Sequence, residues 1–147
     1  MIHELIELNR VIFRESFPEW RSAVAESCTP LVADGSITEQ YVADVIKCVE
    51  THGPYIVIAP DIAIPHSLAG GPGVNRSAIC FMKVEQAVSF EPGNPEKDAR
   101  LFFVLAAKDP DEHLANLVKL VDMLSDEANV AKLIAAKSID DLKSSFA

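Results

Sequence analysis

The run from Arg100 to Ala107 constrains the fold of this chain more than any other feature, because every residue after the arginine is apolar. Such a run is typical of a strand at the centre of a sheet, where both of its faces are buried. Further strand-type runs are found at Val11–Phe13, Tyr55–Ala59 and Ala78–Val84. Segments with helical spacing separate these strands, and no long linker divides the chain. The pattern predicts one α/β unit.

Three helices are expected around these strands. Each begins with a polar residue followed three positions later by an acid, which is the spacing of a capping box. The three expected starts are, in chain order, Ser16–Glu19, Ser36–Glu39 and Asp109–Glu112. The first helix should run to about Ala33, and the second should end before Gly53 and Pro54.

Length and charge narrow the class of protein. The chain has 147 residues, which fits one domain spanning residues 1–147. Its formal net charge of -9 argues against a nucleic-acid partner, because proteins that bind nucleic acid carry basic surfaces. We therefore expect the partner to be a small molecule or a basic protein surface. Composition leaves monomer and homodimer equally open.

Cysteine spacing and hydropathy indicate the compartment. Cys28, Cys48 and Cys80 are widely spaced and form neither a C-x-x-C pair nor a zinc-type pattern, so they are expected to be free thiols in a reducing compartment. The first eight residues interleave acids with apolar residues, unlike a signal peptide. No later stretch is long and apolar enough to span a membrane. We expect a cytoplasmic protein that is not itself inserted in a membrane.

Two histidines stand where regular elements would present them. His66 follows a strand-like run and a proline-stiffened turn, and His113 falls in the first turn of the helix that starts at Asp109, on the same face as Leu117. The crevice beyond the end of a buried strand commonly binds ligands, and a helix N-terminus favours an anion such as phosphate. Two imidazoles are therefore expected to converge on one pocket. The alternative is that His113 only packs or forms a local hydrogen bond.

Motifs for several other chemistries are absent. The sequence contains no G-x-x-x-x-G-K-[ST] nucleotide loop, no H-E-x-x-H metal motif and no G-x-S-x-G nucleophile elbow. His52 keeps a metal site open as an alternative. What remains is an imidazole acting as a nucleophile, which forms a phosphoramidate when it attacks a phosphoryl group.

These residues resemble the enzyme IIA components of the bacterial phosphoenolpyruvate-dependent sugar phosphotransferase system. The similarity is to the fructose/mannitol-type superfamily and, within it, to the ascorbate branch, which carries a G-P-Y-x-V-x-A-P segment before I-A-x-P-H. The segments that carry the resemblance here are Gly53–His66, Gly73-Val74, Val88-Ser89-Phe90 and Asp111–Leu114. They lie within a similar region that extends from Trp20 to about Leu133.

The resemblance implies a three-layer α/β sandwich, with a mixed sheet of about five strands and helices on both faces. It also implies a phosphotransferase that needs neither a cofactor nor a metal. His66 would accept phosphate from the histidine phosphocarrier protein and pass it to a cysteine of the IIB component of a membrane sugar permease, with ascorbate as the compound that the branch implies. His113 would stabilise the transferring group.

The sequence departs from the family beside the active histidine. Many relatives place a small residue and then an arginine there, whereas this chain has Ser67 and Leu68, which we treat as candidate phosphate- or partner-binding residues. We expect Arg76 to supply the missing positive charge. A second arginine of the mannitol-like branch aligns with Glu50, so His52 becomes a candidate third member of the site.

The expected partner surface is an apolar rim formed by Ile64, Leu68 and Val74, unless these residues instead close the core. Two other functions stay open beside transport. One is a regulatory IIA-like phosphoacceptor that controls a transporter, a kinase or a transcription factor. The other is a non-phosphorylated interaction module, which the missing arginine favours.

Overall fold

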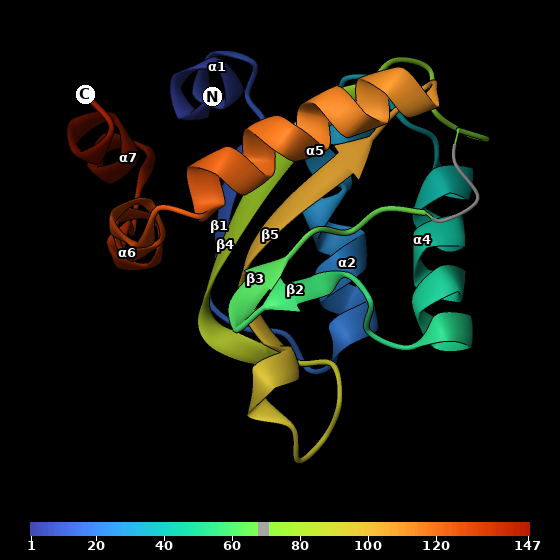
Figure 1. Ribbon diagram of the computed structural model, residues 1–147, viewed down its shortest axis with the longest axis horizontal. Helices are drawn as coiled ribbons and strands as arrows, with labels where there is room; N and C mark the ends of the chain where they lie inside the picture. Colours follow the sequence, from blue (N-terminus) through green and yellow to red (C-terminus); the bar gives the residue numbers. More distant parts are fainter. Residues whose placement is uncertain (68–70) are drawn as a thin grey trace.

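A computed structural model of the protein describes residues 1–67 and 71–147 (Figure 1). Within these residues, one mixed sheet has the strand order β1-β4-β5-β3-β2. The strands are β1 (Val11–Arg14), β2 (Val57–Ala59), β3 (Asp61–Ala63), β4 (Ala78–Ser89) and β5 (Asp98–Ala106). The β1–β4 and β3–β5 pairs are parallel, whereas the β4–β5 and β2–β3 pairs are antiparallel.

Helices cover both faces of this sheet. The helices are α1 (Ile2–Glu7), α2 (Trp20–Ser27), α3 (Thr29–Ala33), α4 (Glu39–His52), α5 (Pro110–Leu124), α6 (Glu127–Ala135), α7 (Ile139–Ser145) and the short 3-10 helix η1 (Pro95–Lys97). One apolar core lies between the sheet and α2, α3 and α4, and a second lies between the sheet and α1, α5, α6 and α7. Figure 1 shows α5 crossing one face while α2 lies behind the other. The expected three-layer α/β sandwich is confirmed.

The central position of β5 is also confirmed. This strand pairs with β4 on one side and with β3 on the other. Leu101, Phe102, Phe103, Val104 and Leu105 are all fully buried, and they alternate between the two cores. The near-continuous apolar run is therefore explained by helices on both faces of the strand.

The predicted helix from Ser16 to Ala33 is wrong in two respects. It begins at Trp20, because the side chain of Glu19 accepts hydrogen bonds from the first backbone N–H groups and so caps the helix. It also breaks after Ser27 into α2 and α3. Pro30 lies at the start of α3, where its missing N–H is tolerated. Inside a continuous helix the same proline would remove a backbone hydrogen bond.

The second helix likewise starts later than predicted. Thr38 precedes its first residue, Glu39, while Ile37 pairs with Val74 as an isolated β-bridge. The hydroxyl of Thr38 donates to the carbonyl of Gly73 at 3.2 Å instead of capping the helix. The loop that contains Gly73 is thereby fastened to the N-terminal end of α4.

The chain between Tyr55 and Ile64 folds as a hairpin rather than as one strand and a turn. β2 begins at Val57, and the reversal at Pro60 leads into β3, which the sequence pattern did not indicate. Asp61 adopts a positive φ of 72° at the start of β3. The apolar alternation is interrupted there, and tertiary pairing of Ile62 with Leu101 determines the strand.

Across the described ranges, no helix is long and apolar enough to cross a membrane. α1, α6 and α7 are short, and the sequence analysis did not assign them. In Figure 1 they lie on the left, on the side of the molecule away from the start of α5.

Gly73 should tolerate no side chain. Its φ is +82°, and an added Cβ would lie 2.8 Å from Thr38 Oγ1 and 2.9 Å from the backbone nitrogen of Tyr41. We expect Gly73→Ala to lower the free energy of unfolding by about 3 kcal/mol, combining about 1–2 kcal/mol for the left-handed backbone with about 1–3 kcal/mol for the clash. Urea denaturation measures this loss.

Gly93→Ala is the matched control, because Gly93 has the same φ of +82° with nothing within 4 Å of the added Cβ. It should show the backbone cost alone. Equal losses for the two variants would mean that the contact between Gly73 and α4 does not constrain the loop.

Candidate functional site

His66 lies just beyond the C-terminal end of β3. The backbone N–H of Leu105 in β5 donates to the carbonyl of Pro65 at 3.0 Å, which continues the β3–β5 contact up to the histidine. The imidazole Nδ1 lies 2.7 Å from the carbonyl oxygen of Ile64. Because a carbonyl can only accept, Nδ1 carries the proton and Nε2 keeps its lone pair. The ring is half-buried.

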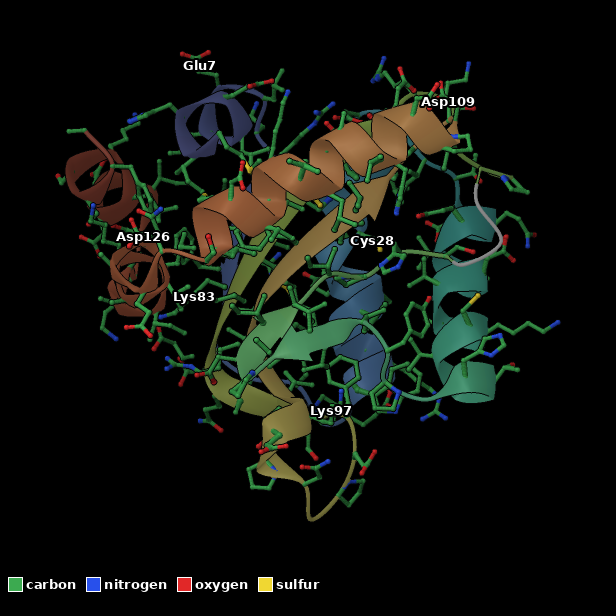
Figure 2. All side chains as sticks on the ribbon, viewed as in Figure 1. Glu7, Cys28, Lys83, Lys97, Asp109 and Asp126 are labelled. Carbon is green, nitrogen blue, oxygen red and sulfur yellow. The ribbon has the colours of Figure 1, made fainter. Side chains whose placement is uncertain are left out.

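His113 faces His66 from the first turn of α5. Asp109 caps this helix, its carboxylate accepting from the N–H of Glu112 at 2.8 Å, and Pro110 occupies the first turn, as predicted. Figure 2 shows Asp109 at the N-terminal end of α5. The ring centroids of His66 and His113 are 5.6 Å apart, with an angle of 48° between the ring planes. The structure thus brings together the two histidines that the sequence analysis paired.

The pKa of His66 lies below the ordinary value of histidine. Burial is the main cause, because desolvation disfavours the charged ring, and the neighbouring His113 lowers the pKa further. The hydrogen bond to Ile64 opposes both effects by favouring the protonated ring. The result is an imidazole that is neutral, and therefore nucleophilic, near pH 7.

Ser67 is buried beside this histidine. Its backbone N–H donates to the hydroxyl of Tyr41 at 3.2 Å, and its Oγ lies 3.7 Å from Cys48 Sγ on α4. The hydroxyl of Tyr55 donates to the carbonyl of His66, and the two rings meet edge to face with centroids 5.2 Å apart. Leu68, the other candidate at this position, lies outside the described residues.

Arg76 makes its contacts on the loop between α3 and α4. Its guanidinium donates to Ser36 Oγ at 3.1 Å and to the carbonyl of Asp34, and it lies 3.6 Å from the Asp34 carboxylate. The side chain remains more than half exposed. Its predicted contact with a phosphoryl group stays a prediction, and such a contact would compete with Asp34.

His52 is the last residue of α4 and is exposed. That end of α4 points away from the start of α5 in Figure 1. Within the described ranges, no hydrogen bond or ring contact joins His52 to His66 or His113. Its role as a third member of the site stays a prediction. Nor do three or more histidine, cysteine or acidic side chains of the described part gather closely enough to hold a metal ion.

The predicted apolar rim is wrong for two of its three residues. Ile64 is 1% exposed and Val74 is 8% exposed, so both close the core instead of facing a partner. The exposed apolar residues nearest to His113 in the chain are Leu114, Val118 and Val121 on α5. These residues lie beside the face of α5 that carries His113 and Leu117, and the apolar rim predicted from the sequence did not include them.

Tyr41 and Tyr55 were also missed as parts of the site. Tyr41 lies in the buried face of α4, and Tyr55 lies between α4 and β2, in a run that the sequence pattern assigns to a strand. The spacing of apolar residues in the sequence does not show which group a buried tyrosine hydroxyl will bond to. The only sequence signal for the two tyrosines is that a buried hydroxyl needs a hydrogen-bond partner.

Comparisons with known proteins agree with this arrangement. Residues 4–147 match the family described as "Phosphoenolpyruvate-dependent sugar phosphotransferase system, EIIA 2". The chain is 30% identical over 123 residues to the mannitol-specific cryptic phosphotransferase enzyme IIA component of Escherichia coli K12, covering 84% of this chain and 82% of that relative. It is 28% identical over 143 residues to the ascorbate-specific EIIA component of Shigella flexneri, covering 93% and 89% of the two chains.

Solved structures share the fold. The solution structure of the mannitol-specific cryptic enzyme IIA of Escherichia coli superposes with a TM-score of 0.84 at 27% identity, covering 98% of this chain and 96% of that one. A complex of the mannitol enzyme IIA with phosphorylated enzyme IIB, from the same species, gives a TM-score of 0.79 at 20% identity, with 92% of each chain covered.

The lowered pKa of His66 predicts how stability depends on pH. Because the folded-state pKa lies below that of the unfolded chain, the stabilising contribution of the neutral ring is complete above the ordinary histidine pKa of about 6.5. It is lost as the pH falls through that value toward the folded pKa. An NMR titration should place the midpoint of His66 below about 6.5.

His113→Ala should raise that midpoint, because it removes a neighbouring positive charge. His3→Ala is the control and should leave the midpoint unchanged, because His3 bonds to the Phe146 carbonyl and not to the site. A midpoint of His66 at or above the ordinary value would contradict the burial of a neutral ring.

Proposed function

The chain belongs to the EIIA 2 family of the phosphoenolpyruvate-dependent sugar phosphotransferase system, and on that premise we propose that it is a phosphocarrier with His66 as its phosphoacceptor. The observation that carries the proposal is the state of the His66 ring. Nδ1 is held by the Ile64 carbonyl, so Nε2 is the nitrogen with an available lone pair. That ring faces a second imidazole rather than a carboxylate.

In the proposed step, Nε2 of His66 attacks the phosphorus of a phosphohistidine on the donor protein. The new N–P bond forms at His66 as the N–P bond on the donor breaks, and the donor ring leaves with its electron pair. The Nδ1 proton remains on its hydrogen bond to Ile64, where the carbonyl stabilises the positive charge that develops on the attacked ring. Positioning and charge stabilisation carry such a transfer.

His113 is proposed to stabilise the phosphoryl group during transfer, and it does not accept that group. Its ring stands beside that of His66, and it projects from the N-terminal turn of a 15-residue helix. An imidazole N–H at this position can donate to a phosphoryl oxygen, and the helix terminus favours the negative charge. Removing His113 should therefore weaken stabilisation of the transferring group without removing the nucleophile.

The donor is proposed to be the histidine phosphocarrier protein, and the acceptor a cysteine of a IIB component that serves a membrane sugar permease. Family membership supports both partners, and the complex of the structurally similar mannitol enzyme IIA concerns a phosphorylated enzyme IIB. Both transfers would take place in the cytoplasm. We propose ascorbate as the transported compound from the Gly53–Pro60 segment, although relatives named for mannitol and for ascorbate match to a similar degree.

His66→Ala should abolish phosphorylation. After incubation with phosphoenolpyruvate, enzyme I and the phosphocarrier protein, intact-mass measurement should show a gain of about 80 Da, one phosphoryl group, on the unaltered chain and none on the variant. His113→Ala should still gain this mass but transfer it onward about 100-fold more slowly, in the range of a lost general acid or charge-stabilising group.

His3→Ala is the control for these variants, because His3 bonds to the Phe146 carbonyl at the other end of the molecule. It should accept and transfer phosphate as the unaltered chain does. A mass gain of one phosphoryl group that persists in His66→Ala would overturn the assignment of the phosphoacceptor.

Onward transfer distinguishes the transport role from the alternatives. The phosphorylated chain should donate to the cysteine of an ascorbate-type IIB component faster than to that of a mannitol-type one, because contacts matched to the cognate partner are lost with the other. The loss of the phosphoryl mass of about 80 Da from the chain and its gain by the IIB component are measured together. Preference for the mannitol type would overturn ascorbate. Phosphorylation without transfer to either would indicate the regulatory role, and no phosphorylation at all would indicate an interaction module.

A further inference from the structure

One peptide group beside the phosphoacceptor is held at both ends by tyrosine hydroxyls. The carbonyl of His66 and the N–H of Ser67 belong to the same peptide bond. The hydroxyl of Tyr55 donates to that carbonyl, and the hydroxyl of Tyr41 accepts from that N–H at 3.2 Å. Both hydrogen-bonding groups of the peptide are thus paired with side chains rather than with a strand.

The two tyrosines are themselves anchored in the fold. Tyr41 is 2% exposed on the buried face of α4, and its hydroxyl donates to the carbonyl of Leu105 at 2.8 Å. Tyr55 follows the end of α4, and its backbone N–H bonds to the carbonyl of Gly53 at 2.8 Å. The peptide is therefore tied through Tyr41 to the central strand and through Tyr55 to the turn that precedes β2.

We propose that Tyr41 and Tyr55 are positioning residues for phosphoryl transfer, which hold the His66–Ser67 peptide so that the His66 ring keeps its Nδ1 bond to Ile64 and presents Nε2 to the phosphoryl donor. The proposal rests on the proposed function of His66. We call the two tyrosines and this peptide the tyrosine clamp.

The clamp acts on the ring through the backbone. Rotation of the 66–67 peptide changes the ψ angle of His66, and the side-chain rotamers that His66 can adopt depend on that angle. A change of rotamer would separate Nδ1 from the Ile64 carbonyl and remove the preference for the Nδ1–H tautomer. Tyr55 restrains the ring a second time, because its edge packs against the imidazole.

Tyr41 can serve in this way across the working pH range. Burial raises the pKa of its phenol to about 12, so the hydroxyl stays protonated and can donate to Leu105 while it accepts from Ser67. A phenol that lost its proton would lose the bond to Leu105. Both bonds of Tyr41 are buried, so replacing this hydroxyl also threatens the fold, whereas half-buried Tyr55 offers the cleaner test.

Tyr55→Phe removes the hydroxyl and keeps the ring. Under single-turnover conditions with the phosphorylated carrier protein, we expect the phosphorylation rate at saturation to fall about 10-fold, while the half-saturating carrier concentration stays unchanged. In the unphosphorylated protein, the ring 15N signals of His66 should move from the Nδ1–H tautomer toward a mixture. Tyr41→Phe should act in the same direction, and the double variant should lose less than the product of the single losses because both act on one peptide.

Leu142→Ala is the matched control for lost stability. Leu142 is buried in α7, at the opposite end of the molecule from the start of α5, so its loss should lower the melting temperature without changing the rate or the 15N signals (Figure 1). A folded Tyr55→Phe protein with an unchanged saturated rate and unchanged His66 signals would overturn the clamp. An unaltered protein that is never phosphorylated would overturn the function of His66 instead, and the 15N signals would still decide whether the clamp sets the tautomer.

Discussion

The hydrogen bonds of the Leu105 backbone connect the core of this protein to its site. The N–H of Leu105 donates to Pro65, and its carbonyl accepts from Tyr41. Leu105 is fully buried near the end of β5, the strand that both cores enclose. These two bonds connect the segment that carries His66 and the helix α4 to the central strand.

The site lies where two parallel strands end together. β3 and β5 run in the same direction, so the residues that follow them, His66 after β3 and α5 after β5, meet at the same edge of the sheet. That edge is where open α/β sheets commonly bind ligands. Burial alone would leave a weakly basic ring, and the carbonyl of Ile64 partly restores its basicity while fixing the tautomer. The local environment therefore balances two opposing effects on one imidazole.

Much of this could be predicted from residue patterns with a local cause. The apolar run in β5, the cap of α5 at Asp109 and the turn at Gly53 each follow from neighbours in the chain. Errors arose where distant residues decided the outcome. β3 depends on pairing with β5, and the start of α4 depends on Gly73, 35 residues away from Thr38. The burial of Ile64 and Val74, which removes the predicted apolar rim, likewise depends on packing from other elements.

The sequence by itself determined the α/β class, the central strand and the two histidines, because apolar periodicity and capping act over a few residues. The tertiary structure alone decided which ring nitrogen of His66 is available, where Arg76 bonds and how the 66–67 peptide is held. Tyr41 reaches Ser67 across 26 residues and Leu105 across 64. Hydrogen bonds between such distant residues have no periodic trace in the chain, since a buried hydroxyl takes whatever partner the packing brings to it.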